Sequence, residues 1–153
     1  MLKIGDKAPA FKLKDQSGID HTLKEYTDQK KKVLIYFYPK DDTPGCTTEA
    51  CSFRDGMKDL ESLGLAVLGI SKDSVASHKK FADKYKLNFP ILSDESLDTI
   101  KAYDAYGPKK FMGREYDGVF RKSVLVNADR HIEKIYQEVK PADHVDEVKG
   151  DVK

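Results

Sequence analysis

Two uninterrupted apolar runs constrain the fold of this chain more than any other feature. Residues Val33–Tyr38 and Leu65–Ile70 contain no charged side chain. Runs of this length are too short for most helices and are typical of strands buried on both faces of a sheet. Between them, from Pro44 to Leu63, apolar residues recur at the spacing of one helix face, and Gly64 follows as a C-terminal cap. The order strand–helix–strand predicts a parallel βαβ unit.

The flanking segments extend this unit into a larger mixed sheet. The pattern predicts a hairpin of Phe11–Lys14 and Thr22–Leu23, a helix over Ser74–Tyr85, a strand over Phe89–Leu92, a helix over Leu97–Tyr103, a long loop over Ala105–Gly118, a closing hairpin of Ser123–Val126 and His131–Tyr136, and a last helix from Pro141. We therefore predict one α/β domain over residues 1–153 with a thioredoxin-like fold. Its central mixed sheet is flanked by helices and carries an N-terminal β-hairpin extension.

Charge and hydropathy argue against several function classes. Lys and Arg number 27 against 26 Asp and Glu, so the chain lacks the basic excess typical of nucleic-acid-binding proteins. No apolar run approaches the ~20 residues of a membrane span, and Met1–Lys7 resembles no secretion signal. We expect a cytoplasmic protein that binds neither nucleic acid nor membrane. In that reducing compartment, the two cysteines are more often catalytic or metal-binding than structural.

Cys46 lies where the first buried strand is followed by the long helix. This carboxyl end of the strands is where sites form in open α/β sheets. Thr43 suits the N-cap and Pro44 the first helical position, which places Cys46 in the first turn. Free backbone amides and the positive end of the helix would stabilise a thiolate there.

Neighbouring charges bear on that thiolate. Asp41 and Asp42 oppose it if they lie close to Cys46. A nearby cation is then needed, and Lys40 and Arg121 are the candidates.

The spacing of Cys46 and Cys51 predicts that a disulfide between them requires a local change in the helix. Five residues along an α-helix separate two Cα atoms by about 8.6 Å, whereas a disulfide requires roughly 7 Å or less. The two thiols therefore cannot bond while the helix is intact. The sequence predicts a reactive thiol and a second thiol that is reached by local unwinding.

The segment Pro39–Cys51, PKDDTPGCTTEAC, resembles the active-site signature of the peroxiredoxins. A second cysteine five residues after the first is similar to the bacterioferritin comigratory protein (peroxiredoxin Q) branch, and the likeness runs from Gly5 to Ser123. The resemblance implies a thiol peroxidase that reduces hydrogen peroxide and organic hydroperoxides and uses no cofactor or metal.

The resemblance also implies a role for each matching residue. Pro39, Thr43, Cys46 and Arg121 would form the peroxide site, with Cys46 oxidised to a sulfenic acid. Cys51 would resolve it as an intramolecular disulfide, and thioredoxin or a glutaredoxin-like dithiol would reduce that bond.

Three further residues qualify the resemblance. Glu49 is expected to steady Arg121. Phe120 and Lys122 depart from the family pattern around that arginine, so the resemblance does not predict which residues form the rim of the pocket. No third cysteine is present, so resolution across a dimer is not available, and we expect a monomer or weak homodimer.

Other interpretations stay open at this point. Either cysteine could be a small buried hydrophobe. A thioredoxin-type disulfide oxidoreductase is disfavoured, because that chemistry usually uses Cys-x-x-Cys. A redox sensor or binder without turnover is the third class. The scattered histidines show no ligand spacing with a cysteine, so no zinc site is expected; His78 is interpreted as a packed or surface residue.

Overall fold

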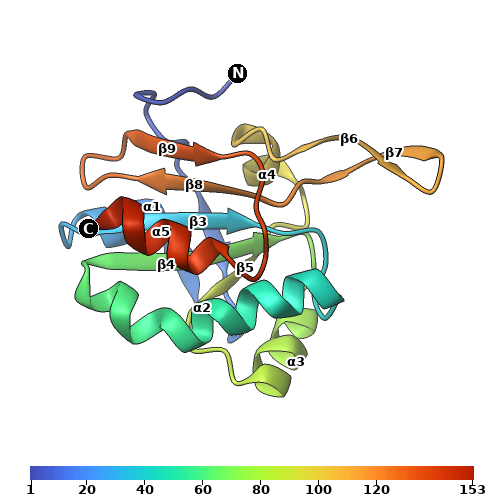
Figure 1. Cartoon of the computed structure of the whole chain (residues 1–153), viewed down its shortest axis with the longest axis horizontal. Helices are drawn as coiled ribbons and strands as arrows, with labels where there is room; N and C mark the ends of the chain where they lie inside the picture. The colour runs from blue at the N-terminus through green and yellow to red at the C-terminus, as the bar shows by residue number, and fades with distance from the viewer.

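The computed structural model describes residues 1–153, and its centre is a seven-stranded sheet in the order β2-β1-β5-β4-β3-β8-β9 (Figure 1). The strands are Lys12–Lys14 (β1), Asp20–Thr22 (β2), Lys32–Phe37 (β3), Leu65–Ser71 (β4), Ile91–Ser93 (β5), Lys122–Val126 (β8) and Ile132–Tyr136 (β9). The order places β3 between β4 and β8, at the interior of the sheet. The predicted central mixed sheet is confirmed.

The strand directions follow the expected connections. β3 runs parallel to β4, and β4 runs parallel to β5. β8 pairs antiparallel with β3 and with β9, and the β1–β2 hairpin joins the other edge through an antiparallel contact with β5. Because β3 is paired on both sides and covered on both faces, Val33–Tyr38 is buried throughout.

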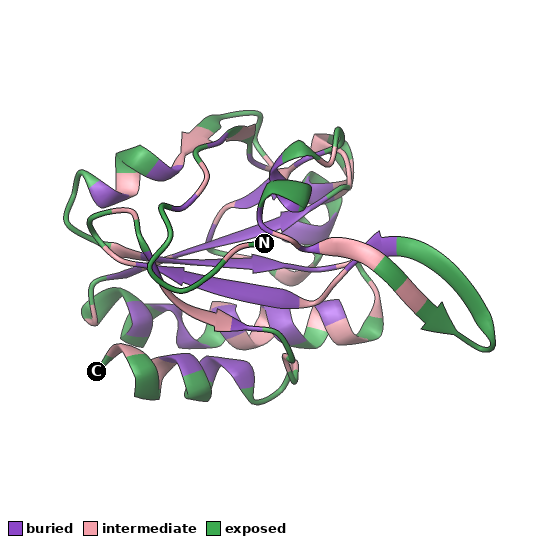
Figure 2. Cartoon of the chain, turned by 90° about the horizontal axis from the view of Figure 1, so that it is seen from above, coloured by how far each residue is buried: buried purple, intermediate pink, exposed green.

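Helices cover both faces of the sheet (Figure 2). They are Leu23–Thr27 (α1), Pro44–Ser62 (α2), Val75–Tyr85 (α3), Asp98–Ala102 (α4) and His144–Val152 (α5). Apolar side chains of α2, α3 and α5 pack with one set of strand residues that includes Leu34 and Tyr36. The alternate residues, including Ile35 and Phe37, pack with α1, α4 and the N-terminal segment. The single strand β3 therefore supplies both cores, as period-two alternation requires.

The predicted loop over Ala105–Gly118 is wrong. Tyr106–Phe111 (β6) and Arg114–Val119 (β7) form an antiparallel hairpin that projects from the body (Figures 1 and 2). Met112 and Gly113 form its tip with positive φ values of 51° and 80°, the backbone expected of a two-residue hairpin turn. Most of the hairpin faces solvent, so its strands lack the apolar alternation that would reveal them in the sequence.

Smaller boundaries also differ, and the strand expected over Phe89–Leu92 is Ile91–Ser93. Leu23, expected in a strand, begins α1 instead, because Thr22 and Glu25 form a reciprocal capping box. The last helix begins at His144 rather than at Pro141, after a turn.

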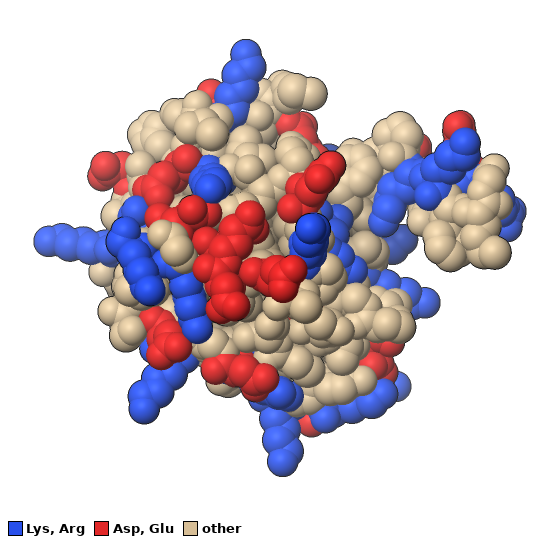
Figure 3. All heavy atoms as spheres, in the orientation of Figure 1, with Lys and Arg blue, Asp and Glu red and all other residues tan.

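The surface carries charges of both signs. Lysines and arginines are interspersed with acidic side chains over the face that Figure 3 shows, and basic side chains also line the protruding hairpin. None of the helices has the length and hydropathy that crossing a membrane requires.

Phe53 of α2 is the aromatic centre of one core. Its ring stacks on Tyr36 at 4.8 Å and meets Phe89 edge-on. Because Phe53 is 0% exposed, Phe53→Ala should lower the free energy of unfolding by about 3–5 kcal/mol in urea denaturation. The control Phe111→Ala, at a side chain 66% exposed, should change it by less than about 0.5 kcal/mol. Equal losses would contradict this assignment of the core.

Candidate active site

The loop Pro39–Thr43 connects the end of β3 to α2, which begins at Pro44. Cys46 lies in the first turn of α2 and is 2% exposed. The first intrahelical hydrogen bond runs from the Thr47 amide to the Thr43 carbonyl, so the amides of Gly45 and Cys46 have no backbone acceptor. Free amides at a helix N-terminus favour negative charge. The sequence prediction for the position of Cys46 is confirmed.

Thr43 occupies the N-cap position, but its side chain does not cap the helix. The Thr43 hydroxyl instead donates to the Lys40 carbonyl oxygen at 2.9 Å. Its oxygen lone pairs are therefore not used by the helix amides. Pro39, at the start of this loop, is half-buried.

Arg121 supplies the cation beside Cys46. It directly precedes β8, and the pairing of Phe37 with Lys122 brings it to the end of β3. Its Nη2 lies 3.2 Å from Cys46 Sγ, and its Nη1 donates to Glu49 Oε1 at 2.9 Å. Partial burial acts to lower the pKa of Arg121, but Cys46 and Glu49 outweigh it and hold that pKa above its ordinary value.

Glu49 is fully buried under the guanidinium. Its side chain is 0% exposed, and its Oε2 has no hydrogen-bond partner. Burial raises the pKa of Glu49 to about 7, although Arg121 acts in the opposite direction. The expected contact between Glu49 and Arg121 is present, whereas the sequence contained no sign that the carboxyl is so strongly desolvated.

Cys51 lies five residues further along α2 and is half-buried. Both cysteines are free thiols. Because α2 is continuous from Pro44 to Ser62, helical geometry keeps their Cα atoms about 8.6 Å apart. A bond between Cys46 and Cys51 thus requires the first turns of α2 to unwind.

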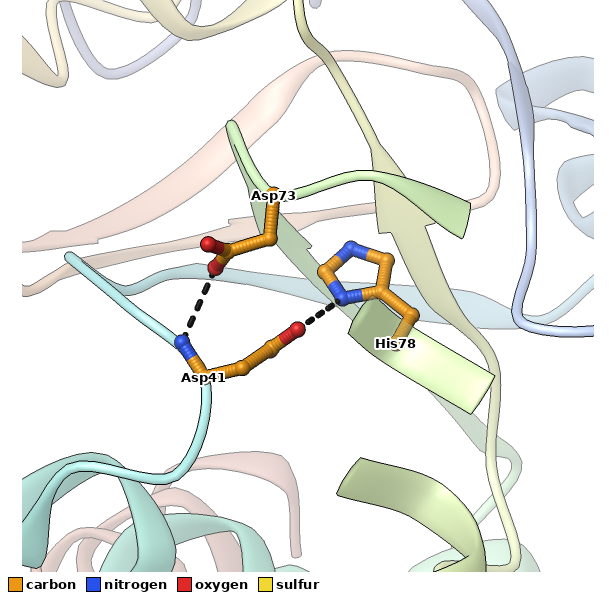
Figure 4. Close-up of side chains that lie close together, drawn as sticks. All are labelled: Asp41, Asp73 and His78. Atoms are coloured by element: carbon orange, nitrogen blue, oxygen red, sulfur yellow. Dashed lines mark hydrogen bonds and ion pairs between the residues drawn. The ribbon is translucent and has the colours of Figure 1, made fainter. Parts of the chain in front are cut away.

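The two aspartates of the loop are both paired with cationic or hydrogen-bonding groups of α3. Asp42 accepts from Lys84 Nζ and from the Tyr85 hydroxyl at 2.8 Å each. Asp41 Oδ2 lies 2.7 Å from Nδ1 of His78, whose side chain is 0% exposed (Figure 4). His78 is thus packed, as one of its two sequence interpretations held, and its contact with Asp41 was not foreseen.

Asp41, Asp73 and His78 form a cluster of possible metal ligands, with their ligand atoms within 4.8 Å of one another (Figure 4). These atoms already have protein partners. Asp73 Oδ2 accepts from the Asp41 amide and from the Ser71 hydroxyl, while Asp41 Oδ2 accepts from the Ser77 hydroxyl. The cluster is a complete hydrogen-bond network that ties the loop to α3.

Comparison with known proteins shows the family of this chain. Residues 4–135 match the family model described as the AhpC/TSA family. The chain is 46% identical to peroxiredoxin Bcp of Escherichia coli over 147 residues, which are 96% of this chain and 93% of that protein. The chain belongs to the AhpC/TSA family of peroxiredoxins. Peroxiredoxin Bcp of Bacillus subtilis is 40% identical over 95% of this chain and 92% of its own.

Solved peroxiredoxin structures share the fold. Peroxiredoxin Q from Xylella fastidiosa superposes with a TM-score of 0.92 at 31% identity, covering 99% of this chain and 96% of that one. The bacterioferritin comigratory protein of Xanthomonas campestris, studied for alkyl peroxide reduction, superposes with a TM-score of 0.89 at 31% identity and the same coverage. The predicted thioredoxin-like fold is confirmed, and as a peroxiredoxin the chain is a thiol peroxidase.

The raised pKa of Glu49 predicts a pH dependence of stability. The folded state holds a proton on Glu49 up to about pH 7, while the unfolded chain releases it near pH 4.5, so stability falls as pH rises between these values. Between pH 5 and 8, wild type should therefore lose about 3 kcal/mol of unfolding free energy relative to Glu49→Gln, measured by urea denaturation. A difference that stays constant with pH would show that Arg121 keeps Glu49 ionised throughout.

Proposed function

We propose that Cys46 is the peroxidatic residue of this peroxidase and that Thr43, Arg121 and Pro39 complete its site. The observation that carries the proposal is the 3.2 Å contact between Arg121 Nη2 and Cys46 Sγ at the free amides of a helix N-terminus. A guanidinium keeps its charge at all physiological pH values and so favours the thiolate, which is the nucleophilic form of cysteine.

The first step oxidises the sulfur. The Cys46 thiolate attacks one peroxide oxygen, the O–O bond breaks, and the departing oxygen takes a proton and leaves as water or an alcohol. Cys46 becomes a sulfenic acid. Arg121 stabilises the negative charge on the departing oxygen, and the Thr43 hydroxyl orients the peroxide, because a hydroxyl both donates and accepts. Pro39 limits the access of water.

The second step uses Cys51 as the resolving residue. Its thiol condenses with the Cys46 sulfenic acid, so that an S–S bond forms and water leaves. The first turns of α2 unwind for this step, since the intact helix holds the two thiols too far apart. Thioredoxin or a glutaredoxin-like dithiol then reduces the disulfide.

The proposal also covers the substrates, the cellular location and the oligomeric state. Hydrogen peroxide and organic hydroperoxides are the substrates, and the site needs no cofactor or metal. The chain works as one domain over residues 1–153 in the cytoplasm, as a monomer or weak homodimer, without binding nucleic acid or membrane.

Stopped-flow reaction of the reduced protein with hydrogen peroxide, followed by mass spectrometry, tests the whole proposal. A fast phase that depends on Cys46 and ends in a Cys46–Cys51 disulfide is expected. A fast phase that ends in a stable sulfenic acid would remove Cys51 from its role. Reaction no faster than that of a free thiol would overturn the assignment of Cys46.

Arg121→Met should slow the first step by about 10²–10³-fold, the usual effect of removing one charge-stabilising donor. Because methionine keeps similar bulk, the loss reports on charge and hydrogen bonding. Arg114→Met, in the exposed strand β7, is the matched control and should leave the rate unchanged. Equal rates in the two variants would contradict the role of Arg121.

Cys51→Ser should complete one rapid round of peroxide reduction and then fail to cycle with thioredoxin, because no thiol is left to condense with the sulfenic acid. Peroxide consumption coupled to thioredoxin oxidation measures this. Sustained turnover of the variant would mean that the reductant attacks the sulfenic acid directly.

A further inference from the structure

The loop Pro39–Thr43 has its most protected contacts at Asp41. Asp41 Oδ2 meets His78 Nδ1 at 2.7 Å and accepts from the Ser77 hydroxyl at 2.8 Å, both from α3. Its Oδ1 accepts from the Tyr38 hydroxyl at 2.7 Å. Its amide donates to Asp73 at 2.9 Å (Figure 4). Every polar group of this one side chain is therefore used to fix the loop.

The His78–Asp41 contact is more deeply buried than the Lys84–Asp42 ion pair, which also connects the loop to α3. The side chains of His78 and Asp41 are 0% and 4% exposed. Those of Lys84 and Asp42 are 58% and 43% exposed, and exposed ion pairs contribute little to stability. The His78–Asp41 contact is consequently the stronger constraint on the position of the loop.

The hydrogen-bond partners of His78 require one additional proton in its contact with Asp41. Its Nε2 lies 3.0 Å from the Leu92 carbonyl oxygen, which only accepts, so Nε2 carries a hydrogen. Its Nδ1 faces the Asp41 carboxyl. A neutral His78 beside an ionised Asp41 would place two lone pairs against each other. The contact therefore contains one additional proton, held by the imidazole or by the carboxyl.

The loop needs such a constraint because of its backbone. Asp42 has a φ of 57°, in the left-handed region that non-glycine residues rarely adopt. It lies between Asp41, which is tied to α3, and Thr43, which begins the turn that carries Cys46. Release of Asp41 would allow Asp42 to relax and would shift Thr43 and Cys46 relative to Arg121.

We propose that His78 is a positioning residue for the peroxide step: through its contact with Asp41, it holds Thr43 and Cys46 in register with Arg121. The proposal rests on the proposed role of Cys46 and extends it to a residue of α3. Because a displacement of about 1 Å can lower a rate about 10²-fold, loss of the contact should reduce the reaction with peroxide far more than the intrinsic reactivity of the thiolate.

The test compares two reactions of Cys46 in a Cys51→Ser background, so that the resolving step plays no part. One is oxidation by hydrogen peroxide and the other is alkylation by iodoacetamide, which needs no orientation of a peroxide by Thr43 and Arg121. His78→Leu should lower the peroxide rate constant by about 10–100-fold and leave alkylation equal or faster. A parallel fall in both rates, or no fall in either, would overturn the proposal.

Two further variants keep the test independent of folding. His78→Leu leaves the buried Asp41 carboxyl without its basic partner. The double variant Asp41→Leu/His78→Leu removes the carboxyl together with the imidazole and should fold, as judged by circular dichroism. It should show the same selective loss of the peroxide rate. The single variant Asp41→Asn, which keeps His78, should retain most of the wild-type peroxide rate. Its side-chain amide donates to Nδ1 of a neutral His78 and so keeps the contact without the additional proton. A folded double variant with the wild-type rate would overturn the proposal, as would an Asp41→Asn variant as slow as the double variant.

The chain offers a matched control in a second histidine–aspartate pair, whose side chains are 13% and 11% exposed. His21 Nε2 lies 2.6 Å from Asp15 Oδ2 in the β1–β2 region, and neither residue contacts the loop Pro39–Thr43. His21→Leu should leave both rate constants unchanged, and a selective loss there would contradict the proposal. Failure of the proposed function itself looks different, because the parent protein would then react with peroxide no faster than a free thiol.

Discussion

The pairing of β3 with β4 on one side and β8 on the other is the constraint on which the rest of this structure depends. β3 ends at Phe37 and is followed by the loop that leads to Cys46. Phe37 pairs with Lys122 on the antiparallel strand β8, so Arg121, which directly precedes Lys122, lies beside that loop. A shift of one residue in this register would turn alternate side chains to the other face and separate Arg121 from Cys46.

Two buried acidic groups near Cys46 each contact one basic side chain. Glu49 pairs with Arg121, and Asp41 pairs with His78. Removing one partner of a buried pair typically costs about 3–5 kcal/mol, since the remaining charge stays desolvated. These pairs therefore favour a single arrangement of the loop and of the first turn of α2. The same first turn must unwind for a disulfide with Cys51, so the site combines a constrained loop with a helix end that has few internal hydrogen bonds.

Much of the site could be predicted from local sequence. A proline and a threonine before Cys46 indicated the helix start, and the apolar run before them indicated the strand end. The arginine was a candidate because a thiolate needs a cation. His78 was missed because nothing in its local pattern distinguishes a packed histidine from one that binds Asp41, 37 residues earlier. The β6–β7 hairpin was missed because its strands lie in solvent and carry no apolar alternation.

The sequence by itself determined the elements and the chemistry available to them: two buried strands, the long amphipathic helix between them, and a thiol in the first turn of that helix. These are local properties, set by periodicity, capping and residue type over a few turns. Only the tertiary structure decided that Arg121, 75 residues from Cys46, lies 3.2 Å from its sulfur. It also decided that Glu49 is desolvated and that His78 meets Asp41. Contacts of this kind depend on strand register and on how completely the packed layers exclude water, and neither is a property of any short segment.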